Sequence, residues 1–236
     1  MEIEQQLFFL SFGVLVATSS IFGLKFFMKG NHLLGAEWLL ITVAATSILV
    51  YALGSVDAAY DVAYFCDAFL RGCGGPAIMI LGLMAVTHDF KPLPYVDLYL
   101  FGGAAAGTAA LVEADAAARF SPVFYLCTWT MLSFYLAHFA RRLLAMGVVR
   151  HAIGVGLVLV AAQAVAVVYD FVTLPGDEEH LYFYTLAASV WSLLCVEMYY
   201  AYCALERVIP ERVRDDDRRE APGRLFRKQG IDADEA

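Results

Sequence analysis

The chain has 236 residues, of which 61% are hydrophobic and 17% are charged, and its formal net charge is −8. Its mean hydropathy is +0.65, and the hydrophobic share exceeds the level of about 45–50% that is usual in soluble domains. The composition therefore excludes an ordinary soluble domain. It predicts a polytopic integral membrane protein whose main partner is the lipid bilayer, and no nucleic-acid partner is expected.

Seven apolar segments follow one another along the chain with short connections between them. Each is close to the roughly 20 residues that a helix needs to cross about 30 Å of hydrocarbon. They cover residues 7–24, 33–54, 61–88, 93–112, 122–139, 152–174 and 181–205. We expect an all-α fold, with a compact bundle of about seven transmembrane helices within residues 1–207. A polar and disordered tail is expected over residues 208–236.

Lysine and arginine lie mainly on one side of this predicted bundle. The first, third and fifth connections and the tail contain most of them, whereas Arg119 is the one basic residue in the second, fourth and sixth connections. Because basic residues favour the cytoplasmic side of a membrane, the N-terminus is predicted to lie outside and the C-terminus in the cytoplasm. The expected location is a cell membrane, with a bacterial inner membrane as the first choice.

The third segment is interrupted near its middle by residues that weaken a helix, namely Gly72, Gly74, Gly75 and Pro76. Pro76 has no N–H to donate to the Gly72 carbonyl, and glycine in a helix interior costs conformational entropy. The pattern predicts that the helix bends or unwinds here. One turn earlier, the i, i+4 spacing of Asp67 and Arg71 places both side chains on one helix face.

Ionisable residues within the predicted spans form two groups when they are sorted by depth. Such residues are costly in a bilayer, so they usually face a partner or a water-filled cavity. The outer group contains Asp67, Arg71, Asp170 and Glu113, with Tyr169 beside it, and the inner group contains Glu37, Asp97, His138 and Glu197. We take both groups as a candidate pathway for a ligand or ion. The alternative for Asp67 and Arg71 is a helix-end pair whose arginine reaches the interface.

The sequence favours no metal site and no cofactor. The five histidines are scattered without HxxxH or HxxH spacing, and the motifs HExxH, GxSxG and the phosphate-binding P-loop are absent. The number of helices and the predicted orientation are those of microbial rhodopsins, which hold retinal on a lysine of the seventh helix. Residues 181–205 contain no lysine, so a covalently bound retinal is excluded.

Three classes of function remain open. The first is a protein that binds or transports a small molecule or ion along a polar, carboxylate-lined pathway. The second is an intramembrane enzyme that acts on a lipid or isoprenoid with carboxylates as acid and base. The third is a receptor-like or accessory subunit. The sequence names no ligand or reaction, and it leaves open whether the chain forms a homo-oligomer.

Overall fold

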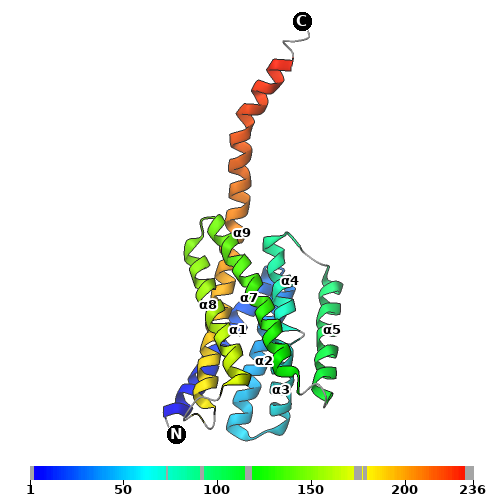
Figure 1. The fold of residues 1–236 in the computed structure, drawn as a ribbon, viewed down its shortest axis with the longest axis vertical. Coiled ribbons are helices and arrows are strands. Elements are labelled where there is room, and N and C mark those ends of the chain that lie inside the picture. Colours follow the sequence, from blue (N-terminus) through cyan, green and yellow to red (C-terminus); the bar gives the residue numbers. More distant parts are fainter. Residues whose placement is uncertain are drawn as a thin grey trace.

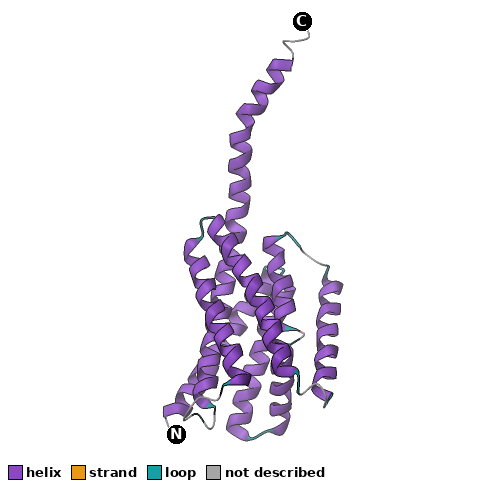
Figure 2. Ribbon diagram, viewed as in Figure 1, coloured by secondary structure: helices purple, strands orange, loops and turns teal. Residues whose placement is uncertain are grey.

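The computed structural model describes residues 3–72, 74–90, 93–114, 119–172, 177 and 180–231, with side chains up to residue 210 apart from that of Pro94. The described residues form helices and no strands (Figure 2). These helices are α1 (Ile3–Met28), α2 (His32–Gly54), α3 (Asp57–Arg71), α4 (Gly75–Thr87), α5 (Pro94–Glu113), α7 (Ser121–Ala145), α8 (Val149–Phe171) and α9 (Leu181–Ile231).

Six of the described helices are long and apolar enough to cross a membrane: α1, α2, α5, α7, α8 and the first part of α9. The pair α3 and α4 passes the same test as one broken span, bent by 56°. Helix α1 begins at one end of the bundle and α9 leaves it at the other (Figure 1), as an odd number of crossings requires. The prediction of an all-α bundle with about seven membrane-spanning helices is confirmed.

The helices are arranged as a closed ring. Helix α1 packs on α2 and α9, the α3–α4 pair lies between α2 and α7, and α8 closes the ring between α7 and α9. Fully buried side chains such as Trp38, Leu132 and Leu194 pack between the helices. Phe134, Leu157 and Val160 are exposed on the outside, as expected for side chains that face lipid. A polar site is therefore expected on the inside of the ring.

Helix α5 lies outside this ring (Figure 1). It packs against α3 and α2, and the rings of Phe69 and Phe101 stack with centroids 6.1 Å apart. Residues of α5 are thus separated from the inside of the ring by the helices that α5 covers.

Local polar contacts fix the helix ends. The Asn31 side chain accepts a hydrogen bond from the Leu34 N–H (3.1 Å) and donates one to the Gly82 carbonyl (2.8 Å), so it caps α2 and ties it to α4. Buried Asp177 accepts from the N–H groups of Tyr182 (3.0 Å) and Phe183 (2.8 Å) at the start of α9. Asp177 therefore caps the start of α9.

At the end of the bundle where α9 leaves, Lys29 forms an ion pair with Glu206 (2.6 Å). This hydrogen bond raises the pKa of Lys29 above its ordinary value. The pair joins the end of α1 to α9.

The structure differs from the sequence-based expectation beyond residue 207. A disordered tail was predicted over residues 208–236, whereas the structure continues α9 as a helix to Ile231, projecting away from the bundle (Figure 1). The segment is rich in arginine, which has a high helix propensity, so a helix that starts in the bundle can extend into it. Residues 232–236 lie outside the described part of the chain.

Candidate functional site

The site is built around the break between α3 and α4. Beyond the last residue of α3, the N–H of Gly72 donates to the Ala68 carbonyl (3.0 Å) and that of Gly74 to the Phe69 carbonyl (3.1 Å). A Cβ on Gly75 would collide with the Leu70 carbonyl oxygen, so this turn requires glycine. Of the predicted break, Cys73 lies outside the described residues, and Gly72 to Pro76 otherwise stand where α3 ends and α4 begins.

The broken ladder leaves the Arg71 carbonyl without its helical partner, and α7 supplies another. The Thr128 hydroxyl lies 2.7 Å from the Arg71 carbonyl oxygen and 2.9 Å from its own helix's Tyr125 carbonyl, and it donates between them. A buried carbonyl without a donor is costly in a membrane. Thr128 therefore holds the broken end of α3 against α7. Sequence reasoning missed this residue, because a threonine in a helix usually bonds only to its own backbone.

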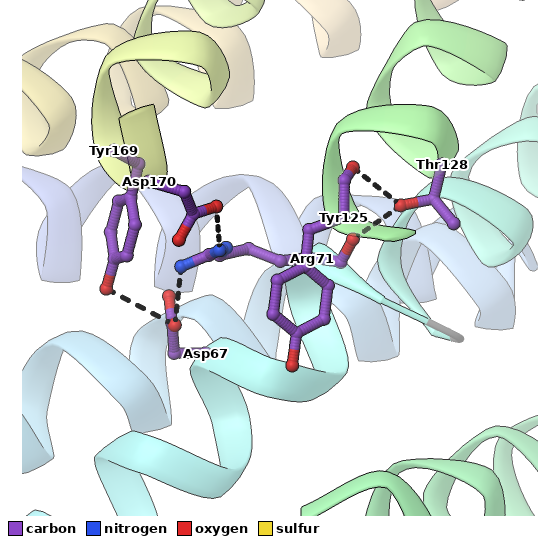
Figure 3. A network of polar contacts seen from close by, with 6 residues as sticks. All are labelled: Asp67, Arg71, Tyr125, Thr128, Tyr169 and Asp170. Atoms are coloured by element: carbon purple, nitrogen blue, oxygen red, sulfur yellow. Dashed lines mark hydrogen bonds and ion pairs between the residues drawn. The ribbon is translucent and has the colours of Figure 1, made fainter. Parts of the chain in front are cut away.

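The Arg71 side chain points into the ring and joins two carboxylates (Figure 3). One terminal nitrogen lies 2.5 Å from Asp170 Oδ2 and the other lies 3.3 Å from Asp67 Oδ2. The Tyr169 hydroxyl donates to the same Asp67 oxygen (3.3 Å). The side chain of Arg71 is only 11% exposed and that of Asp170 15%. The structure thus brings together three residues of the predicted outer group, from α3 and α8.

Two tyrosine rings complete the surroundings of the guanidinium group. The Arg71 Cζ atom lies 3.8 Å from the centre of the Tyr169 ring and 4.4 Å from the centre of the Tyr125 ring (Figure 3). Cations are attracted to aromatic faces at such distances, and the planar guanidinium group also stacks on them. Tyr125 was missed by the sequence analysis, since its helix face cannot be read from one aromatic residue among many.

Glu37 of α2 is the second polar element of the site. Glu37 is 1% exposed, and its Oε2 atom has no hydrogen-bond partner among the described residues. A Cβ on Gly75 would lie 3.0 Å from Glu37 Oε1, so the carboxyl group sits beside the first residue of α4. The N-terminus of a helix carries a partial positive charge and free N–H groups. The break in the third span thereby places the N-terminus of α4, with its partial positive charge, next to a buried carboxyl group.

Both elements line one cavity of about 420 Å³. This volume lies within the range of small-molecule sites, which is roughly 300–1,000 Å³. On α2 the residues that line the cavity run from Glu37 to Ala52. At a rise of 1.5 Å per residue, this part of the helix is about 22 Å long. The remaining wall is mainly apolar and aromatic, and includes Phe12, Trp129, Tyr184 and Trp191.

The cavity reaches one end of the bundle. Its lining includes Tyr51, Tyr60 and Leu181, which lie near the end of α2 and the beginnings of α3 and α9. Tyr51 is 41% exposed and Tyr60 51%. The cavity therefore opens at the end of the bundle where α1 begins, the end that the distribution of lysine and arginine predicts to be outside.

The other predicted site residues lie elsewhere. Glu197 pairs with His151 (2.9 Å) between α9 and α8, and the His138 ring stacks with that of His88. Asp97 is buried on α5, and Glu113 is exposed at the end of that helix. None of these four residues from the two predicted groups lines the cavity.

The predicted inner group is therefore not brought together, and this is a correction. Glu37 belongs instead to the cavity that contains Asp67, Arg71 and Asp170. The physical reason is that depth along a helix does not say which face a residue occupies. The position of α5 outside the ring also keeps Asp97 and Glu113 away from the cavity.

Within the part of the chain that the structure describes, no three His, Cys, Asp or Glu side chains are placed to hold a metal ion. Comparison with protein-family models, with curated protein sequences and with solved structures gives no match for this chain. The cavity is therefore the feature of this chain whose chemistry bears on its function.

Proposed function

We propose that this membrane protein binds a small amphipathic molecule in the central cavity and carries it across the membrane. The observation that supports this most is that a single cavity combines apolar and aromatic walls with two polar elements. These are the Asp67–Arg71–Asp170 network and Glu37, whose Oε2 atom has no hydrogen-bond partner among the described residues. Ligand sites typically have mostly apolar walls and a few polar groups that fix orientation.

The position of the break adds support. Carriers often place their binding sites where a membrane helix is interrupted, because the free helix ends supply partial charges to a ligand. Here the end of α3 carries Arg71 into the cavity, and the start of α4 lies beside Glu37. A bent span with a short connection is also an element that can change its angle when a ligand binds.

An intramembrane enzyme is the second candidate, and Glu37 is the observation that favours it. Glu37 is buried, and its Oε2 atom has no hydrogen-bond partner in the part of the chain that the structure describes. Together with Asp67 and Asp170 in the same cavity, it supplies the groups needed for acid and base chemistry. The two candidates differ in where the cavity opens. A carrier needs an opening to water, whereas an enzyme that acts on a lipid needs an opening to the bilayer.

Co-purification tests the proposal. The protein would be extracted together with its native lipids, and the small molecules that it retains would be identified by mass spectrometry. The variants are Ala44→Phe, which fills the cavity from α2, and Ala106→Phe, which makes the same change on the exposed surface of α5.

We expect the wild type and Ala106→Phe to retain the same small molecule in near-stoichiometric amounts, and Ala44→Phe to lose it. Equal retention by all three proteins, or no retained molecule in the wild type, would contradict the proposal. Monodisperse elution of each variant serves as the control for folding.

A further inference from the structure

The charges that line the cavity are unequal. Of the described residues in its wall, Glu37, Asp67 and Asp170 are acidic, and Arg71 is the one basic residue. If all four are ionised, the wall carries two more negative than positive charges. The acidic residues near the predicted outer end, including Asp57 and Asp61, add to a field that attracts cations.

Arg71 is poorly placed to receive an anion. Its two terminal nitrogens already donate to Asp67 and Asp170, and its guanidinium group packs on the rings of Tyr125 and Tyr169. An anionic ligand would have to compete with two carboxylates that the fold holds in place. The arrangement instead shows how this cavity accommodates a cation, namely with carboxylates and aromatic faces together.

Glu37 lacks such a cation. It is almost fully buried and lines the cavity, and its Oε2 atom has no hydrogen-bond partner among the described residues. Buried polar groups are normally paired, and buried charges nearly always are. The N-terminus of α4 beside Glu37 supplies only partial charges. A ligand with a positive charge would complete the pair.

The walls fit the rest of such a ligand. Trp129 and Trp191 line the cavity from α7 and α9, with their ring centroids 4.7 Å apart. Phe12 and Tyr184 extend this aromatic surface on α1 and α9. Aromatic faces attract ammonium groups, and quaternary ammonium ions in particular are bound in this way. The same rings also cover an apolar body.

We propose that the ligand of this cavity is an organic cation with an apolar body, such as a hydrophobic amine or quaternary ammonium ion, whose charge is paired with Glu37. This inference rests on the proposed function, because it names the class of molecule that the cavity binds.

The test uses three probes of similar size and different charge. Benzyltrimethylammonium is the cation, neopentylbenzene is its uncharged carbon analogue, and benzylsulfonate is the anion. Binding is measured in lipid nanodiscs through the fluorescence of Trp129 and Trp191, the two of the three tryptophans that line the cavity. The third, Trp38, is fully buried and outside the lining. The Ala44→Phe variant gives the background from partition into lipid.

We expect benzyltrimethylammonium to bind at least about tenfold more tightly than the other two probes, because only the cation compensates a buried carboxylate. Glu37→Gln keeps the shape of the side chain. It should lower the affinity for benzyltrimethylammonium by about tenfold or more, with little effect on the affinity for neopentylbenzene. Asp97→Asn is the matched control, since Asp97 is also buried with an unpartnered oxygen among the described residues but does not line the cavity.

Equal binding of the cation and its uncharged analogue would overturn the inference and leave the proposed binding function standing. An unchanged affinity of folded Glu37→Gln for the cation would also overturn it. If none of the probes binds, the inference fails, while co-purification still decides the proposed function. The comparison of probes on the wild type needs no variant, so a poorly folded Glu37→Gln does not prevent a decision.

Discussion

Arg71 shows what a charged side chain requires inside a membrane bundle. Removing a charge from water costs several kcal/mol, and this cost is offset only by close partners of opposite charge and further polar contacts. Arg71 has two carboxylates and two aromatic rings as partners. These neighbours offset the cost of burying the guanidinium group.

Substitution of Arg71 is expected to be costly. Arg71→Gln leaves Asp67 and Asp170 without their cation, and we expect it to lower the free energy of unfolding by about 3–5 kcal/mol. The double variant Asp67→Asn with Arg71→Gln should be more stable than Arg71→Gln alone, because it removes one of the two uncompensated carboxylates. Thermal unfolding of the single and double variants in one detergent measures this.

The pair between Lys29 and Glu206 provides the matched control for Arg71. The side chains of Lys29 and Glu206 are 29% and 45% exposed, against 11% and 15% for Arg71 and Asp170. Lys29→Gln should therefore cost only about 0–1 kcal/mol, as exposed ion pairs do. If the losses at Asp67 and Arg71 are additive and each lies below about 1 kcal/mol, the network is a solvated helix-end pair and the account of the site is wrong.

At this scale the sequence was informative where residues share one helix and less so between helices. The spacing of Asp67 and Arg71 indicated a common face, and depth indicated that Asp170 lies at a similar level. Tyr125 and Thr128 could not be predicted, because their roles depend on how α7 is rotated toward the break. Glu37 was assigned to another group because its depth along α2 does not say which face of the helix it occupies.

Among the elements, the break between α3 and α4 has the largest consequences. It ends α3 with Arg71 in the cavity, and it begins α4 beside Glu37. The three glycines and Pro76 made a break predictable from sequence, since each weakens the helical ladder. The bend of 56° and the contact with Thr128 could not be predicted, because they depend on α7 and α2.

A side chain at Gly75 should disturb this break. The Cβ of Gly75→Ala would collide with the Leu70 carbonyl, and backbone cannot move aside cheaply. We expect a loss of about 1–3 kcal/mol, typical of overpacking, together with weaker ligand retention. Gly102→Ala on α5 is the control, because its Cβ meets nothing within 4 Å, and it should be neutral or slightly stabilising. Equal unfolding temperatures of the two variants would argue against a glycine requirement at the break.

For the whole molecule, hydropathy predicted the number of spans but not their arrangement. The ring of helices, and the position of α5 outside it, arise from the packing of particular side chains, such as Phe69 against Phe101. Hydropathy does not distinguish these phenylalanines from others in the chain. The predicted orientation rests on lysine and arginine, and the cavity opens at the predicted outer end.

The segment beyond the bundle is expected to contribute little to stability. Residues 211–231 extend away from the packed helices (Figure 1), and an isolated charged segment gains nothing from burial. Deleting residues 211–236 should leave the unfolding temperature of the bundle unchanged, and their amide protons should exchange rapidly with solvent. A marked loss of stability on deletion would mean that this segment packs on the bundle.

The most direct test of the account asks whether the cavity opens to water at the predicted outer end. In a background without the five native cysteines, Ala187→Cys places a thiol in the cavity wall and Val155→Cys places one in the fully buried core of α8, outside the lining. A water-soluble, membrane-impermeant methanethiosulfonate is then added to intact cells. We predict that Ala187→Cys is modified and that Val155→Cys is not. Protection of Ala187→Cys from this reagent, with modification by a membrane-permeant maleimide, would show that the cavity does not open to water at the predicted outer end and would contradict the account.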